Sequence, residues 1–229
     1  MAKSKIIKDL ANSAVDIQTV LKRTKVLLQE LEDETILEWV KYEIEGYPND
    51  VEVPEYRKIG GQLVGTYIKG SMASHMQYKN VSLPLGTMPE DQKEKILYSN
   101  LTQSIEALYD MAKSGEGICK QLPADIFPLI ATYNNDPYMY IVGAEVKLNM
   151  SQVLSIFPKV ESKLLDILCY LERQFGNLDE LDIDKESKTE AELEEIVQHI
   201  YVLIYNDNSV SIGNNNRIKD SNIVATVNE

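Results

Sequence analysis

L-E-W-V-K-Y-E-I-E-G-Y-P-N-D-V-E-V-P-E-Y-R, residues 37–57, joins the predicted helical part of the chain to its first predicted strand. It contains the chain's one tryptophan, Trp39, in a helix that Gly46-Tyr47-Pro48 is expected to end. Glycine suits the left-handed backbone just beyond a helix, and proline cannot continue one. Pro54 then favours extended geometry in the residue before it. We expect this stretch to dock a helical hairpin onto a β-containing body.

Two helices are predicted before the glycine. Apolar residues recur at steps of three and four from Ser4 to Leu31, which predicts one long amphipathic helix with a heptad stripe. Asp33 is well placed to cap a second helix that ends at Gly46. The joint between them is short, so the two helices are expected to pack as an antiparallel, coiled-coil-like hairpin.

Periodicity and turn residues predict the remaining elements. In chain order they are a bulged strand over Tyr56–Lys69, its partner over Met76–Leu85, a helix from the Thr87–Glu90 capping box to Gly115, a strand over Tyr138–Asn149, a helix over Ser151–Phe175, a helix over Thr189–His199 and a strand over Ile200–Tyr205. The predicted fold class is α+β: a helical hairpin and long helices packed on a small antiparallel sheet. The predicted divisions are a domain over 1–176, an acidic linker and short helix over 177–199, and a β tail over 200–229.

The segment 206–229 is rich in Asn and Ser and resembles short β-rungs, because Asn tolerates left-handed turns and its amides can stack in ladders. Two or three rungs cannot bury a core alone, so we expect the tail to pair with other copies, with a trimer favoured among the symmetric options. The residues predicted to mediate oligomerisation are Val210, Ile212, Asn214, Asn215, Asn216, Ile218 and Ile223. A disordered polar C-terminus and an edge strand on the main domain are the alternatives.

Composition narrows the classes of function. The chain has 229 residues and a net charge of −13, which disfavours general nucleic-acid binding. No apolar run is long enough to cross a membrane and no signal peptide is recognised, so a cytoplasmic protein is predicted. Two cysteines, Cys119 and Cys169, do not form a disulfide framework, and we expect buried free thiols.

No catalytic motif is recognisable, which leaves open whether the chain is an enzyme. The two histidines, His75 and His199, have no Cys or His at metal-ligand spacing, and no cofactor or metal is expected. A calcium loop beginning at Asp182 fails, because Leu193 stands where a bidentate acid is needed. Asp136 and Glu145 are candidates for a two-metal nuclease by position only, and solvent-facing carboxylates explain them more simply.

The chain resembles the AbiTii family of bacterial abortive-infection domains. The resemblance rests on the opening heptad helix, on L-E-W-V-K-Y-E-I-E-G-Y-P at 37–48 and on V-P-E-Y-R-K-I at 53–59, and it extends over residues 4–175. The signature residues, for which we expect a structural role, are Trp39, Gly46, Tyr47, Pro48, Pro54 and Tyr56. The resemblance implies a part in phage defence and brings no catalytic residues to transfer.

Three functions therefore compete. The first is a phage-defence protein that acts through homo-oligomeric assembly and through interaction with a phage or host protein. The alternative is a metal-dependent nuclease or nucleotide-depleting toxin, to which the basic face of the first helix would steer an anion. The third is a structural oligomer with no toxic action.

Overall fold

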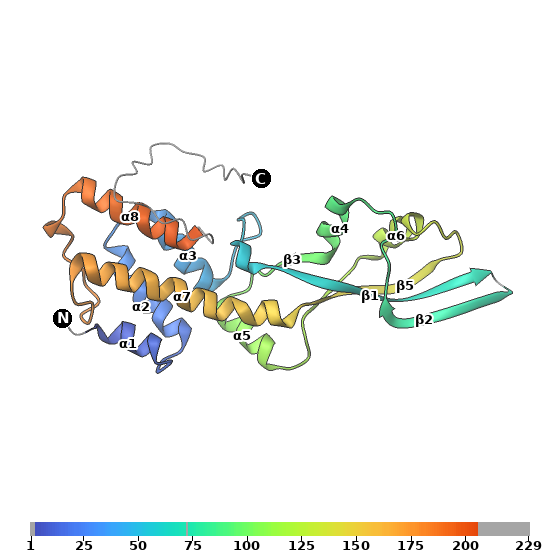
Figure 1. Cartoon of the computed structure of the whole chain (residues 1–229), viewed down its shortest axis with the longest axis horizontal. Helices are drawn as coiled ribbons and strands as arrows, with labels where there is room; N and C mark the ends of the chain where they lie inside the picture. Colours follow the sequence, from blue (N-terminus) through green and yellow to red (C-terminus); the bar gives the residue numbers. More distant parts are fainter. Residues whose placement is uncertain (1–2, 72, 206–229) are drawn as a thin grey trace, which may run out of the picture.

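The computed structural model describes residues 3–71 and 73–205, which form an elongated molecule with a helical body and a β arm (Figure 1). The body gathers four helices around α7 (Met150–Phe175): α1 (Lys5–Ala11), α2 (Ile17–Gln29), α3 (Glu34–Glu45) and α8 (Glu190–Tyr205). The arm is a sheet that carries α4 (Glu90–Leu97) and α6 (Phe127–Tyr133). This is the predicted α+β class. None of the helices in the described ranges combines the length and hydropathy needed to span a bilayer.

The first helix of the sequence prediction is two helices. α1 ends at Ala11, Ser13 has a left-handed φ of 50°, and the side chain of Asp16 accepts a hydrogen bond from the Thr19 N–H at the start of α2. The prediction of one continuous helix was wrong because the apolar residues keep their spacing across the turn, whereas the backbone leaves the helical conformation there. Asp16 caps a new helix instead of continuing the old one.

The second helix was predicted correctly at both ends. Asp33 accepts hydrogen bonds from the backbone N–H groups of Thr35 and Ile36, and α3 then runs to Glu45. Gly46 follows with a φ of 101°. α2 and α3 pack against each other as the predicted hairpin.

The sheet is antiparallel, with strand order β2-β1-β5-β4 and β3 paired to the first part of β1. Its strands are β1 (Lys58–Ser71), β2 (Ser74–Ser82), β3 (Tyr98–Asn100), β4 (Cys119–Gln121) and β5 (Tyr140–Leu148). One face is buried, where α4 (Glu90–Leu97) contacts β1 and α6 (Phe127–Tyr133) contacts β5. The three main strands lie where the sequence placed them.

A β-bulge changes which residues of β5 face the core. The register with β1 shifts so that Tyr67 pairs with Ile141 while Thr66 pairs with Gly143, which leaves Val142 as the extra residue. In a regular strand Tyr140, Val142 and Ala144 would lie on one face. Ala144 is buried, but Tyr140 and Val142 are exposed, because one extra residue reverses the alternation.

The helix predicted from the Thr87–Glu90 capping box to Gly115 is interrupted. α4 begins at Glu90 without a side-chain cap, and the Thr87 hydroxyl donates to the Tyr133 carbonyl. β3 then separates α4 from α5 (Ile105–Lys113). Pairing of Tyr98–Asn100 with Lys58–Gly60 outweighs helix propensity over these residues, since it completes the base of β1.

The strand predicted over Ile200–Tyr205 is the last part of α8, and the predicted boundary at residue 200 falls inside that helix. Ile196, Ile200 and Ile204 are buried at helical spacing, and α8 contacts α3 and α7. A short apolar run fits either structure, and here the four-residue spacing of the isoleucines decides it. The predicted oligomerisation residues of 206–229 lie outside the described residues.

Glu172 ties α1 to the far end of α7. Its carboxylate accepts hydrogen bonds from the Ser4 N–H at 2.6 Å and the Ser4 hydroxyl at 2.7 Å, and it pairs with Lys3 at 2.6 Å. Partial burial alone would raise the pKa of Glu172, but these hydrogen bonds lower it from 4.5 to about 2.

The depressed pKa predicts an acid-dependent part of the stability. Because the folded-state pKa of about 2 lies below the unfolded value of 4.5, Glu172 stabilises the fold fully above pH 4.5, and this contribution is lost as the pH falls towards 2. Glu172→Gln should lower the free energy of unfolding near neutral pH and should lack this part of the acid dependence in urea titrations. Asp166→Asn, an exposed carboxylate on the same helix, is the control. An acid dependence equal to that of the unaltered chain would contradict the assignment.

Candidate functional site

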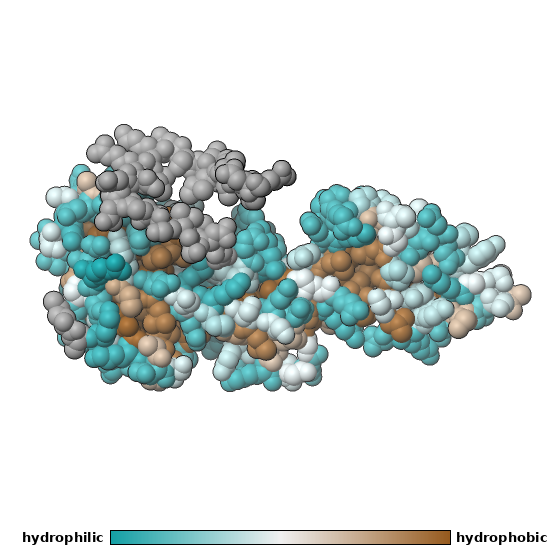
Figure 2. Space-filling model, in the orientation of Figure 1, coloured by the Kyte–Doolittle hydropathy of each residue, from teal (hydrophilic) through white to brown (hydrophobic). Residues whose placement is uncertain are grey.

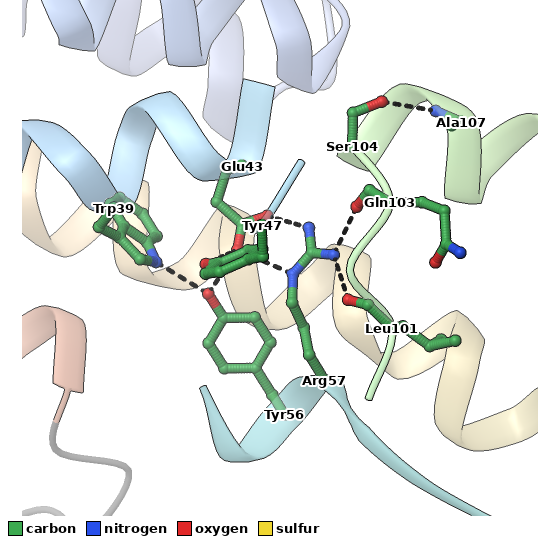
Figure 3. A network of polar contacts seen from close by, with 9 residues as sticks. All are labelled: Trp39, Glu43, Tyr47, Tyr56, Arg57, Leu101, Gln103, Ser104 and Ala107. Carbon is green, nitrogen blue, oxygen red and sulfur yellow. Dashed lines mark hydrogen bonds and ion pairs between the residues drawn. The ribbon is translucent and has the colours of Figure 1, made fainter. Parts of the chain in front are cut away.

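A buried polar network lies where α3, the base of β1 and the segment before α5 meet (Figure 3). The Trp39 indole N–H donates to the Tyr56 hydroxyl at 2.8 Å, and that hydroxyl donates to Glu43 Oε1 at 2.8 Å. The Tyr47 hydroxyl donates to the same oxygen at 2.7 Å. The carboxylate of Glu43 therefore accepts hydrogen bonds from both tyrosines of the signature and is linked to its tryptophan through Tyr56.

Arg57 supplies the opposite charge. Its Nε donates to Glu43 Oε1 at 3.0 Å, and a second N–H group donates to Oε2. Nη1 donates to the carbonyl oxygens of Leu101 at 2.9 Å and Gln103 at 2.7 Å. The side chains of Glu43 and Arg57 are both 0% exposed. A buried ion pair of this kind is tolerated when its remaining polar atoms are also hydrogen bonded, as they are here.

The protonation of the network is fixed. Burial, reinforced by the charge of Glu43, raises the pKa of both Tyr47 and Tyr56 far above that of an ordinary phenol. Burial alone would lower the pKa of Arg57, but Glu43 raises it above its usual value. The phenols remain donors and the guanidinium remains charged across the physiological range. These three groups have no proton to exchange near neutral pH, so they fit a structural role better than acid–base chemistry.

The turn residues of the signature bring two segments into contact. A Cβ on Gly46 would lie 2.9 Å from the Thr102 carbonyl oxygen, in addition to the strain of its positive φ. The Tyr47 N–H donates to that same carbonyl at 2.7 Å. The Pro54 carbonyl accepts from the Arg57 N–H at 2.8 Å, whereas Pro48 is exposed. Gly46 is thus required for the close approach of α3 to the 101–103 segment.

Sequence reasoning missed the two central residues, Glu43 and Arg57. A signal for the first was present, because Glu43 follows Trp39 by four positions and so lies on the same helix face. An acid on a buried face needs a partner. Nothing in the sequence pattern identified Arg57 as that partner, nor the carbonyl groups of the 101–103 segment.

The other candidates from the sequence do not converge. Asp136 lies 3.7 Å from Lys69, Glu145 is bound by Gln121 at 2.6 Å, and across the described ranges no group of three or more His, Cys, Asp or Glu side chains could hold a metal ion. His75 is exposed on β2, and the His199 ring stacks on Tyr170 at 4.1 Å. Cys119 is exposed on β4, so the prediction that this thiol is buried was wrong.

The arm carries an open surface that the sequence analysis did not identify. A hollow of about 820 Å³ lies between α6 and the first half of β5, lined by Phe127, Pro128, Ala131, Asp136 and the residues Met139–Val142. Of these lining residues, Tyr140 is 67% exposed and Val142 54%, and the neighbouring Tyr138 is 63% exposed. We call the hollow and these three side chains the arm surface. Figure 2 shows apolar residues gathered on the arm as well as on the body.

Removing the charge of Glu43 should destabilise the fold, because Arg57 would remain buried without a counter-charge. Glu43→Gln is expected to lower the free energy of unfolding by about 3–5 kcal/mol, measured by urea denaturation. Glu90→Gln, which removes a carboxylate from an exposed pair with Lys93, is the matched control and should change little. Equal effects of the two substitutions would contradict the central place of the pair.

Comparison with known proteins finds one family. Searches among curated proteins and among solved structures find no match. The sequence profile of AbiTii matches residues 4–197, which is most of the chain and extends beyond the boundary predicted at residue 176. The match includes α3, the buried network and the arm. The chain therefore belongs to the AbiTii family.

Proposed function

We propose that this protein acts in phage defence through protein interaction and homo-oligomeric assembly. Membership of the AbiTii family supports a role in abortive infection. The assembly of copies through 206–229, with a trimer as the favoured form, rests on the Asn-rich pattern of that segment. The buried network is proposed as the structural joint that holds the body and the arm in one arrangement.

The arm surface is the observation that carries the interaction part of the proposal. Tyr138, Tyr140 and Val142 are the exposed apolar side chains beside a hollow whose other walls are also largely apolar. Tyrosine is enriched at interfaces because its ring buries a large area while its hydroxyl stays hydrogen bonded. An exposed apolar patch next to a concave surface is typical of a protein-binding site.

The chemistry of the same region does not favour the enzyme alternative. The hollow contains one carboxylate, Asp136, which accepts a hydrogen bond from the Tyr138 N–H and pairs with Lys69. A two-metal site requires several acidic ligands that converge on one point. A protein partner, a phage or host component, suits this surface better.

Removing the tyrosine rings should abolish protection while the fold remains. The double variant Tyr138→Ser/Tyr140→Ser is expected to unfold at a temperature close to that of the unaltered chain, since both rings are exposed, and to lose protection in phage plating assays. Tyr201→Ser, an exposed tyrosine on α8, is the matched control and should protect normally. Normal protection by the double variant would contradict the proposed interaction at the arm surface.

Assembly should depend on the tail and on protein concentration. In sedimentation experiments the full chain is expected to reach the mass of three copies at high concentration, because β-rungs from single tails are too few to form a core alone. A chain that ends at Tyr205 should stay monomeric at every concentration. If the shortened chain assembles as the full chain does, the tail is not the oligomerisation element.

A further inference from the structure

The first half of β5 has an unpaired edge. On the side away from β1, β4 pairs with β5 only over Glu145–Lys147, and the Leu122 N–H extends the contact to the Ala144 carbonyl. No strand in the described ranges continues this pairing along Tyr140–Gly143. The hollow of the arm surface lies along this same edge. An apolar strand edge beside an apolar hollow is a site for an added strand.

The chain contains a segment of matching chemistry outside the described residues. Asn222–Val227 reads N-I-V-A-T-V, which has no charged residue and four β-branched side chains. Such a sequence has high β-propensity. Its alternate side chains would fall on the two faces of an added strand, one set towards the hollow and the other beside Tyr140 and Val142.

The segment can reach the edge of its own chain. The Leu203 carbonyl near the end of α8 accepts a hydrogen bond from Lys163, whose Nζ lies 5.7 Å from the Tyr56 ring, so α8 ends near the base of β1. From Lys58 to Ile68, the partner of Tyr140, β1 extends over ten residues or about 33 Å. The 16 residues of 206–221 span up to about 53 Å when extended, which is enough.

The direction of the chain also fits. β1 runs outward from the body and β5 returns towards it, since Ile68 pairs with Tyr140 and Gly61 with Leu148. A tail that leaves α8 and runs outward along the arm would therefore lie antiparallel to β5, as β4 does. It would extend the line of β4 beyond Ala144 with antiparallel hydrogen bonds that are interrupted at the bulge residue Val142.

We propose that Asn222–Val227 adds as a strand to the Tyr140–Gly143 edge of its own chain and covers the arm surface. The regulatory consequence of this docking rests on the proposed function of the arm surface. A docked tail hides the surface that binds the partner and is itself unavailable to other copies. Partner binding and tail docking exclude each other, so the partner releases the tail for assembly.

Disulfide crosslinking tests the contact in the full chain. In a background of Cys119→Ser/Cys169→Ser, Val142→Cys is combined with single cysteines placed in turn at residues 222–227. The crosslink within one chain is expected to be strongest at the single tail position opposite residue 142 and weak at its immediate neighbours, because a disulfide requires Cα atoms within about 7 Å and side chains alternate across a strand. Gln77→Cys is the matched control on the opposite edge of the sheet, since Gln77 pairs with Ile68 from the other side. Mixing isotopically labelled and unlabelled chains distinguishes bonds within a chain from bonds between chains.

Three results would overturn the inference. Crosslinking no stronger than that of the Gln77→Cys control would show that the tail does not dock at this edge. Bonds only between chains would show that a second copy supplies the strand. A disulfide-locked chain that assembles to the same extent as the reduced chain would show that release of the tail is not needed for assembly.

The outcomes separate this inference from the proposed function. A crosslink confined to one tail position, together with normal protection by Tyr138→Ser/Tyr140→Ser, would place the tail on the arm and refute the interaction function. Loss of protection in that variant without crosslinks would refute only the docking of the tail. Docking and function both stand if the crosslink is confined to one tail position, the locked chain stays monomeric and the double variant fails to protect.

Discussion

The buried pair of Glu43 and Arg57 is the interaction on which the arrangement of the molecule depends. Two opposite charges removed from water are tolerated only when the geometry is close and the remaining polar atoms are bonded. Here those conditions involve three separate segments. α3 provides Glu43, the residue before β1 is Arg57, and the carbonyl groups of residues 101 and 103 accept the remaining hydrogen bonds of the guanidinium. If one segment moves, a buried charge loses a partner. The pair therefore favours one orientation of the body relative to the arm.

Other contacts extend this constraint to the last helix. Lys163 of α7 reaches the carbonyl of Leu203 in α8 at 3.1 Å and lies over the ring of Tyr56. Tyr56, whose hydroxyl donates to Glu43, therefore also packs its ring against the ammonium group of Lys163 that is hydrogen bonded to α8. Three helices distant in sequence, α3, α7 and α8, meet near the residue from which β1 starts. The base of the arm is accordingly anchored to the helical body.

How much of this could be read from the sequence depended on the range of the interaction. Some local signals were reliable: α3 begins after Asp33 and ends before Gly46 as predicted, because caps involve residues only a few positions apart. Longer-range effects were not accessible. The insertion of β3 between α4 and α5 depends on strand pairing with β1, and even the local break before Asp16 was missed because apolar periodicity does not report capping. The bulge at Val142 reversed the exposed face of β5, and with it hid the arm surface from sequence analysis.

The same difference in range explains why the most distinctive stretch of sequence is not the proposed binding surface. Trp39, Tyr47 and Tyr56 are conspicuous as residue types, but all three are buried and hydrogen bonded within the network. Tyr138 and Tyr140 are less distinctive in sequence, and their significance comes from the bulge, the end of β4 and the position of α6, which together leave an edge and a hollow open. The buried network fixes the position of the base of the sheet. The exposed edge further out has unpaired backbone groups that an added strand would satisfy. A strand edge that exchanges a docked tail for a protein partner would require firm support at its base and an incomplete sheet beyond it.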